Sequence, residues 1–284
     1  MVRGLYTGAS GMLSQWHNMN VVANNLANIN TTAFKKDEAL FKSFPEMLIR
    51  RLDDNGVVKI PPGSYDIAPI VGKIGTGTEL NEIYTRHEQG SLRSTENDFD
   101  MALFGKGFFV VNTGKGERYT RNGNFTMDKD GFLVTKEGFR IQGEKGDIRV
   151  KANNFRIGEY GEIAMNKEYE SKDLGQFVDK IGNEWKKSEI VDKLRIVNFY
   201  DELGLRKEGN SYYQATKYSG EAEDKRIGEG RAKVVQGFIE VSNVNPVLEM
   251  TRMIEVQRSY EASQKVVTSN DHLLSKAVSD LPRA

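Results

Sequence analysis

Residues 1–34, MVRGLYTGASGMLSQWHNMNVVANNLANINTTAF, contain the pattern that decides the fold. Apolar and small side chains recur there at alternating steps of four and three residues, which is the spacing of a coiled-coil seam rather than of a strand. The members of this seam are Leu5, Ala9, Met12, Trp16, Met19, Ala23 and Leu26. The sequence therefore predicts a helix over about residues 5–30 that packs against another helix.

The same segment is rich in residues that form helices poorly. Glycines stand at positions 4, 8 and 11, and Gly in a helix is less favourable than Ala by about 1 kcal/mol. Amide side chains recur every four residues at Asn20, Asn24 and Asn28, and they form a polar stripe beside the seam that can hydrogen-bond to neighbouring helices. We therefore expect a helix that is weakly stable alone and has more than one contact face.

A matching helix is predicted at the other end of the chain, over residues 247–278. Pro246 suits a first helical position, where its missing N–H costs nothing. The two helices would be about 39 Å and 48 Å long at 1.5 Å per residue, so they can lie side by side. The seam of the second helix consists of Met253, Val256, Tyr260, Ser263, Val267, Asn270, Leu274 and Ala277. We expect residues 1–34 and 241–284 to form one helical assembly domain.

The residues between the helices, 35–240, predict a β-rich body. Residues 35–97 lack a helical period and are interrupted by Pro and Gly, which indicates an extended connecting region with short strands near 67–71 and 79–86. From residue 103 onward, short runs of aromatic and branched residues alternate with turns such as DKDG at 128–131, which is typical of antiparallel sheets. The expected fold class is α+β, with paired terminal helices and a central, mostly antiparallel β domain.

Composition excludes several classes of function. Lys plus Arg and Asp plus Glu number 40 each, so the chain has no basic field for nucleic acid or for an anionic membrane. No segment reaches 18 apolar residues, so membrane insertion is not expected. The absence of Cys excludes disulfides and thiol chemistry. The N-terminus also lacks the pattern of a cleaved secretory signal, and these residues alone would indicate the cytoplasm.

No catalytic, metal or cofactor site is predicted. Asp128 and Asp130 suggest a calcium loop, but Phe132 and Leu133 stand where that loop needs an oxygen ligand and a glycine, so a turn is favoured. The glycine clusters lack phosphate-loop spacing, and the three histidines are scattered. A cell-wall glycosidase is the alternative of another class, but 40 acidic residues make a pair of carboxylates uninformative. We expect a protein that is not an enzyme.

Eight ordered motifs carry a resemblance that covers both ends and the middle of the chain. They are GLYTGASGM (4–12), VVANNLANINTTAFK (21–35), GKGFFVV (105–111), YTRNGNF (119–125), GFLVTKEG (131–138), VQGFIEVSNVNPVLEM (235–250), MIEVQRSYEASQK (253–265) and NDHLLSKA (270–277). In this order they resemble the bacterial flagellar basal-body rod and hook protein family.

The resemblance implies a structural subunit of the basal-body rod, packed helix beside helix around a hollow axial tube that transmits torque to the hook. Its partners would be copies of itself, other flagellar rod and hook axial proteins, and the flagellar type III export apparatus. It would lie in the basal body across the periplasm, after export without a cleaved signal. The expected assembly interface consists of Leu5, Ala9, Met12, Trp16, Met19, Ala23, Asn24, Leu26, Asn28, Met253, Val256, Tyr260, Val267 and Leu274. From the residues alone, a helical hairpin that completes a monomer remains an equal alternative.

Within the family, the segments MVRGLYTGASGM and FKSFPEMLIRR most resemble the proximal rod protein, and YTRNGNF and SNVNPVLEM are shared with the distal rod protein, which is the second choice beside a hook-type axial protein. Residues 166–192 resemble an insertion relative to the family pattern. Ala33 stands where the family more often has Gly, which argues against a positive φ at this position.

Overall fold

The computed structural model describes residues 2–44, 46–50, 57–60, 63–66, 70–151, 154–166, 188–223 and 232–280. The chain divides into two compact units, which we describe separately. The helical unit comprises residues 1–26, 37–84 and 246–284, and the β unit comprises residues 27–36 and 85–245. Residues 37–84 thus group with the terminal helices, whereas the sequence pattern had grouped them with the β-rich body.

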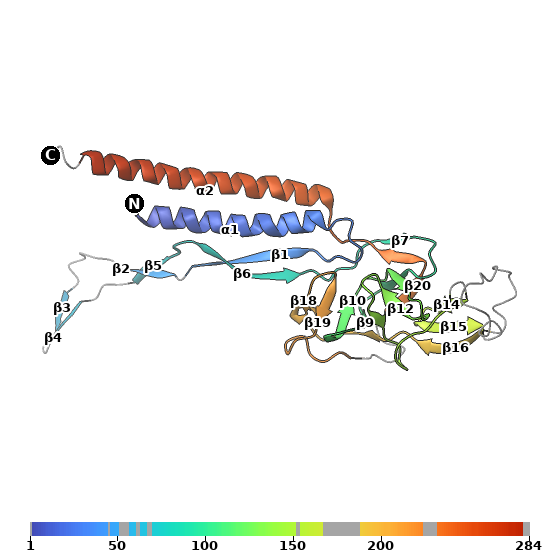
Figure 1. Cartoon of the computed structure of the whole chain (residues 1–284). Helices are drawn as coiled ribbons and strands as arrows, with labels where there is room; N and C mark the ends of the chain where they lie inside the picture. The colour runs from blue at the N-terminus through green and yellow to red at the C-terminus, as the bar shows by residue number, and fades with distance from the viewer. Residues whose placement is uncertain are drawn as a thin grey trace. The chain divides into compact units, whose positions relative to one another are not determined.

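The helical unit contains two helices, α1 (Val2–Ala27) and α2 (Pro246–Asp280), which lie side by side (Figure 1). Helix α2 begins at Pro246, the first helical position that the sequence predicts. Gly4 of α1 faces Asn270 of α2, and Gly11 faces Ser263, so the two helices run antiparallel. The two terminal helices are therefore confirmed in place and type.

A long two-stranded ribbon forms the rest of the helical unit. Strand β1 (Asp37–Ser43) pairs with β6 (Thr78–Thr85), and further out β2 (Met47–Arg50) pairs antiparallel with β5 (Ile70–Ile74), and β3 (Val57–Ile60) with β4 (Gly63–Asp66). Strand β6 confirms the strand expected near 79–86. Of the strand expected near 67–71, residues 67–69 lie outside the described residues.

The β unit is built from short strands that pair antiparallel. Its largest sheet has the order β11-β12-β13-β9-β10-β19-β18, and β17 also pairs with β9. A three-stranded sheet has the order β14-β15-β16, and the pairs β8–β20 and β7–β21 complete the unit. The strands are β7 (Leu92–Ser94), β8 (Met101–Phe104), β9 (Phe108–Thr113), β10 (Gly116–Thr120), β11 (Phe125–Met127), β12 (Leu133–Thr135), β13 (Arg140–Ile141), β14 (Phe155–Ile157), β15 (Glu162–Asn166), β16 (Ser188–Lys193), β17 (Ile196–Val197), β18 (Arg206–Lys207), β19 (Tyr212–Gln214), β20 (Lys233–Gln236) and β21 (Phe238–Glu240).

Strand β9 lies at the centre of the β unit and is buried on both faces. Phe109 and Val111 belong to one apolar cluster, and Phe108 and Val110 belong to another. Since successive side chains of a strand point to opposite faces, the continuous apolar run FFVV is what such a central strand requires. The aromatic and branched residues of the GKGFFVV motif therefore organise two cores rather than one.

The turn at residues 128–131 closes the hairpin between β11 and β12. The N–H of Gly131 donates to the carbonyl of Asp128 at 2.9 Å, and Gly131 has a φ of 82°. This φ lies in the left-handed region that favours glycine. The interpretation of DKDG as a hairpin turn is therefore confirmed.

One expectation about the backbone is wrong. Ala33 has a φ of 55°, although its Cβ makes this region unfavourable. Its side chain is fully buried, and its N–H donates to the carbonyl of Glu240 at 2.8 Å. The hydrogen bond and the burial hold the residue in this conformation, so the Gly to Ala difference did not remove the positive φ. The expected insertion at 166–192 lies mostly outside the described residues, except for Asn166 and strand β16.

Candidate assembly surface

One face of α1 approaches α2 through its glycines. A Cβ at Gly8 would lie 2.8 Å from Cγ2 of Val267, and one at Gly4 would lie 3.1 Å from Oδ1 of Asn270. Real Cβ atoms do not approach other atoms as closely as the first of these distances. The early glycines therefore allow close packing of α1 on α2. Sequence reasoning treated them as weak helix formers that add a contact face, and it did not predict that they meet α2. Their spacing at positions 4, 8 and 11 was the available signal.

A second face of α1 is polar and binds the ribbon. The hydroxyl of Thr7 donates to the carbonyl of Thr76, and the hydroxyl of Ser14 donates to the carbonyl of Thr78, both at 2.9 Å. Near the other end of the helix, Asn25 donates to the carbonyl of Asp37 at 2.8 Å and accepts from its N–H at 2.9 Å. Asn25 is buried and satisfies the backbone at the start of β1. Hydroxyls in the first half of α1 and the Asn25 amide in its second half thus fix the ribbon by directional bonds.

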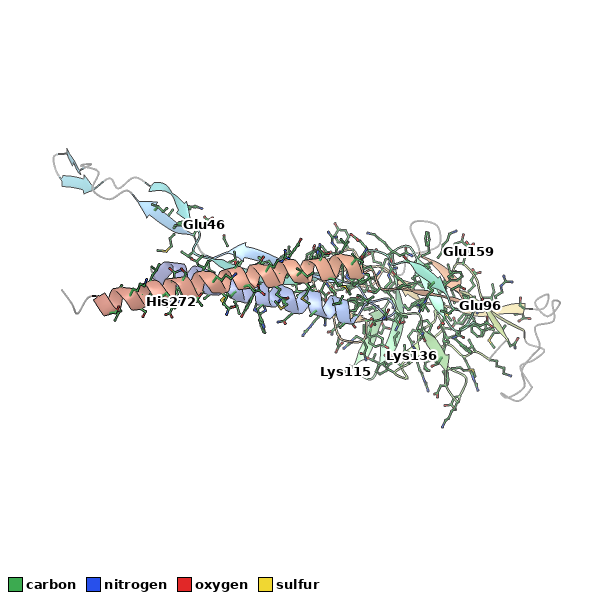
Figure 2. All side chains as sticks on the ribbon, turned by 90° about the horizontal axis from the view of Figure 1, so that it is seen from above. Glu46, Glu96, Lys115, Lys136, Glu159 and His272 are labelled. Carbon is green, nitrogen blue, oxygen red and sulfur yellow. The ribbon has the colours of Figure 1, made fainter. Side chains whose placement is uncertain are left out.

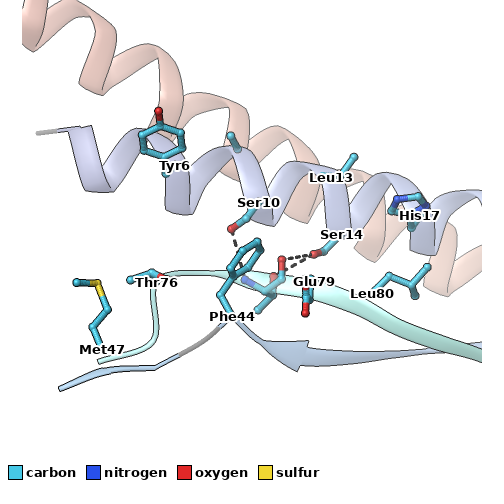
Figure 3. Close-up of a pocket in the computed structure, with 12 residues that line it drawn as sticks. Tyr6, Ser10, Leu13, Ser14, His17, Phe44, Met47, Thr76, Glu79 and Leu80 are labelled. Carbon is cyan, nitrogen blue, oxygen red and sulfur yellow. Dashed lines mark hydrogen bonds between the residues drawn. The ribbon is translucent and has the colours of Figure 1, made fainter. Parts of the chain in front are cut away.

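A groove of about 770 Å³ lies between α1 and the ribbon (Figure 3). Helix α1 contributes Tyr6, Leu13 and His17 to its lining, and the ribbon contributes chiefly Phe44, Met47 and Leu80. The hydrogen bonds of Ser10 and Ser14 to Thr78 form its floor. Hereafter "the groove" means this site, which is preformed, concave and mainly apolar.

The structure places the expected interface residues of α2 on one stripe. Val256 is buried, and Met253, Tyr260, Val267 and Leu274 are half-buried. Most residues on the other sides of α2 are exposed, and side chains point away from the helix over its length (Figure 2). These five positions are therefore largely covered within a single chain.

The expected interface residues at the N-terminal end fall into two groups. The half-buried group consists of Leu5, Met12, Met19, Leu26 and Asn28, and the exposed group consists of Ala9, Trp16, Ala23 and Asn24. The first group includes Asn28, which lies just beyond α1 in the β unit. A single heptad stripe thus becomes a covered line and a solvent-facing line.

Large apolar side chains remain exposed along the helical unit. On α1 these are Tyr6, Leu13 and Trp16, which are 68%, 58% and 49% exposed. Others lie along α2 and on the ribbon, as in Leu248, Met250, Ile254, Leu273, Leu48 and Ile83. Among the described residues, most of the exposed large apolar side chains belong to this unit. Extended exposed apolar surface marks a site of protein interaction.

The β unit buries a charged cluster that joins the segment after α1 to the segment before α2. The Nζ of Lys35 donates to Oε1 of Glu240 and to the carbonyl of Glu88, both at 2.6 Å. The N–H of Gly90 donates to the same Oε1 at 2.8 Å, and Nη1 of Arg121 lies 3.7 Å from Oε2. Burial lowers the pKa of Lys35, and Glu240 opposes that shift. Sequence reasoning missed this cluster, although a lone charge in the apolar runs TAFK and GFIEV was a signal.

His87 adjoins this cluster and is kept neutral chiefly by burial. Its ring packs against Tyr213 and Phe108, with centroids 5.1 and 5.8 Å apart, and neither ring nitrogen has a hydrogen-bond partner among the described residues. Burial, followed by the charges of Lys35, Arg121 and Lys207, lowers the pKa of His87 to about 4. The imidazole is therefore a packing group at neutral pH.

Neither a metal site nor a membrane span emerges from the residues whose structure is described. No three His, Asp or Glu side chains in that part of the chain gather closely enough to ligate a metal ion. No helix among the described residues combines the length and the apolarity that crossing a bilayer demands. Paired terminal helices with exposed apolar faces are typical of a subunit that associates with other proteins.

Family models match at both ends of the chain and in its centre. "Flagella basal body rod protein" matches residues 5–35, "Flagellar hook protein FlgE/F/G D1 domain" matches residues 102–165, and "Flagellar basal body rod FlgEFG protein C-terminal" matches residues 235–280. The first and third matches fall on the regions of α1 and α2, and the second falls on the β unit. The three matches occur in the same order as the motifs noted above.

Full-length relatives extend this similarity over nearly the whole chain. The flagellar basal-body rod protein FlgG of Bacillus subtilis is 33% identical and covers 98% of each chain, and FlgG of Buchnera aphidicola subsp. Acyrthosiphon pisum is 31% identical and covers 97% of this chain and 98% of its own. The flagellar hook-basal body complex protein FlhO of B. subtilis is 28% identical over 99% of each. This chain belongs to the flagellar basal-body rod protein family and is a structural component of the bacterial flagellum.

Proposed function

We propose that the chain polymerises through its terminal helices into the axial rod that transmits torque to the hook. The observation that carries this proposal is the exposed apolar line of α1, where Trp16 and Leu13 remain about half exposed after α1 has already packed on α2 and on the ribbon. A helix that contacts α2 on one face and the ribbon on another, and leaves a third apolar face exposed, is suited to packing against other subunits. A rod that transmits torque needs many such contiguous contacts, because close-packed interiors deform little.

Membership of the family supports proposals for the subunit's place in the rod, its export and its neighbours. In the assembled rod, the terminal helices would continue the coiled-coil-like layer, and the subunit would span the periplasm after passage through the export apparatus without a cleaved signal. The FlgG relatives, which are distal-rod proteins, favour the distal rod over the proximal rod that the sequence motifs had favoured. Rod and hook axial proteins would be the neighbours. No relative named here supports a glycosidase.

A substitution at Trp16 tests polymerisation. Trp16→Asp places a charge on the exposed face of α1, where it is solvated in the free chain but would be buried without a partner in a subunit contact. Cells that depend on this variant should lack rods and motility, while the melting temperature of the purified chain stays close to that of the unmodified protein. Trp16→Phe is the matched control and should assemble.

Two further variants probe the covered line. Leu26→Asp and Met253→Asp fall at half-buried positions, so they should block assembly and also lower the stability of the helical unit.

Normal rods from Trp16→Asp would exclude the exposed face of α1 from the subunit contact. Loss of stability in Trp16→Asp would instead assign the face to the fold of the single chain.

A further inference from the structure

The groove has a rigid floor and an apolar lining. In the connection between β5 and β6, a Cβ on Gly77 would lie 2.2 Å from Oγ of Ser10, so the ribbon is packed tightly on α1 there. Above this floor, Tyr6, Leu13 and Met47 are each about half exposed or more. A concave apolar surface of this kind is suited to a convex apolar occupant.

Helix α2 carries an apolar ridge of this shape. The ridge consists of Val247, Met250 and Ile254, which follow one another at steps of three and four residues and therefore share one side of the helix. Their side chains are 69%, 53% and 53% exposed. Val256, which is buried, lies on another side of the helix. The ridge is thus a second apolar surface of α2, distinct from the stripe that is covered within the chain.

The ridge of a chain is far from the groove of the same chain. Because Gly4 lies opposite Asn270 and Gly11 lies opposite Ser263, the middle of the groove on α1 comes level with about residue 262 of α2. The middle of the ridge lies about 12 residues away, which is about 18 Å along the helix at 1.5 Å per residue. An α2 ridge can therefore occupy the groove only if it belongs to another copy that is displaced along the helix axis.

The lengths and the chemistry of the two surfaces match. The ridge from Val247 to Ile254 fits within the stretch of α1 from Tyr6 to His17, and Arg258, one turn beyond Ile254, extends it to the same number of residues. When a second copy has the same orientation, its α2 runs antiparallel to α1, and Val247 comes level with His17 while Arg258 comes level with Tyr6. The exposed guanidinium of Arg258 can then lie over the exposed ring of Tyr6 and form a cation–π interaction with it.

We infer that the groove binds the α2 ridge of a second copy of this chain. The inference rests on the proposed polymerisation and specifies two of the surfaces that it uses. Because the groove and the ridge are different surfaces, each copy offers one of each after pairing. Such a heterologous contact generates an open helical chain rather than a closed dimer.

Cysteine cross-linking tests this contact, since the chain has no Cys of its own. Full-length Leu13→Cys and full-length Ile254→Cys, one of them enlarged by a tag, are mixed, concentrated and treated with a short thiol cross-linker. Sedimentation measures assembly in the same samples. We expect a cross-linked heterodimer several-fold more abundant than from the control pair Leu13→Cys and Leu273→Cys. Leu273 matches Ile254 in exposure and lies on the same helix outside the ridge.

The outcomes separate the inference from the proposed function. Sedimenting assemblies without heterodimer enrichment would overturn the groove contact and leave polymerisation standing. A dominant homodimer of Leu13→Cys would also overturn it, because that product requires two grooves to face each other. If the unmodified chain forms no assemblies and the heterodimer is absent, both the inference and the proposed function fail.

Discussion

Lys35 and Glu240 form an ion pair with Nζ and Oε1 2.6 Å apart, although 205 positions separate them in the sequence, and both side chains are fully buried. Lys35 lies shortly after α1, and Glu240 lies shortly before α2. The backbone bonds Ala33 to Glu240 and Asn243 to Phe34 join the same two segments. The pair therefore fastens both ends of the β unit at the place where the chain passes to its terminal helices.

Removing one partner of this pair should destabilise the β unit strongly. Glu240→Gln leaves Lys35 and Arg121 without their carboxylate in a buried site, and breaking a buried ion pair costs about 3–5 kcal/mol. Urea unfolding of the full chain, followed by a probe of the β unit, measures this loss. Lys233→Met is the control, because the Lys233–Glu159 pair is exposed and solvent-screened pairs contribute little to stability. Equal effects of the two variants would show that burial does not govern the contribution of these pairs.

The stability of the β unit should fall as the pH drops from about 6.5 to about 4. Burial and neighbouring cations lower the pKa of His87 to about 4, so the unfolded chain binds a proton in this window that the folded chain does not. Stability therefore rises with pH between the two values, and the full effect is on the order of 3 kcal/mol. His87→Phe keeps a ring against Tyr213 and should remove this part of the pH dependence.

His272→Phe is the control for that measurement, because His272 is exposed on α2 (Figure 2). Free energies of unfolding are measured from pH 7 to pH 4 for the three proteins. A slope that persists in His87→Phe would assign the acid sensitivity to other groups. A slope that His272→Phe removes would place it in the helical unit.

Local periodicity was sufficient for the terminal helices, since Pro246 and the seam of α2 mark that helix directly in the sequence. The hairpin turn at Asp128 and Gly131 was equally readable, because turn chemistry depends on adjacent residues. The sequence predicted a strand at Phe108 and Phe109 but not that both of its faces are buried. A continuous apolar run does not reveal what covers each face.

Long-range pairing was beyond the sequence. The bonds from Ser14 to Thr78 and from Asn25 to Asp37 join α1 to the ribbon, and no local pattern says which helix face will meet which strand. The seam rule favoured the larger apolar side chains of α1 as the contact with α2, whereas glycines make the closest approach. The burial of Lys35 against Glu240 depends on both chain ends reaching one place, which periodicity cannot show.

Enlarging Gly8 should separate the two terminal helices. Gly8→Val would place new atoms against Val267, whose Cγ2 is only 2.8 Å from the position of a Cβ. We expect faster amide hydrogen exchange in α1 and α2, with little change in the exchange of β9. Ala9→Val is the matched control, because Ala9 is exposed and should tolerate the larger side chain.

A second substitution tests the cause of that effect. Adding Val267→Ala to Gly8→Val removes the atoms that clash, so protection of α1 should partly return. Protection unchanged by Gly8→Val would show that this glycine does not set the distance between the helices. A loss that Val267→Ala cannot relieve would instead assign the effect to the other atoms near Gly8, the Ser263 carbonyl oxygen and Cγ1 of Val266.

Ala33 should tolerate Gly but not Val. In Ala33→Gly, relief from the unfavourable positive φ is offset by the greater freedom of Gly in the unfolded chain and by the loss of a buried methyl group, so stability should change by no more than about 1 kcal/mol. In Ala33→Val, a β-branched side chain must adopt a φ near 55° in a fully buried site, which should cost more than about 2 kcal/mol. Urea unfolding of the β unit measures both changes. If Ala33→Val is as stable as the unmodified chain, the backbone at this position does not hold a left-handed conformation, and the hydrogen bond from Ala33 to the Glu240 carbonyl does not constrain the β unit.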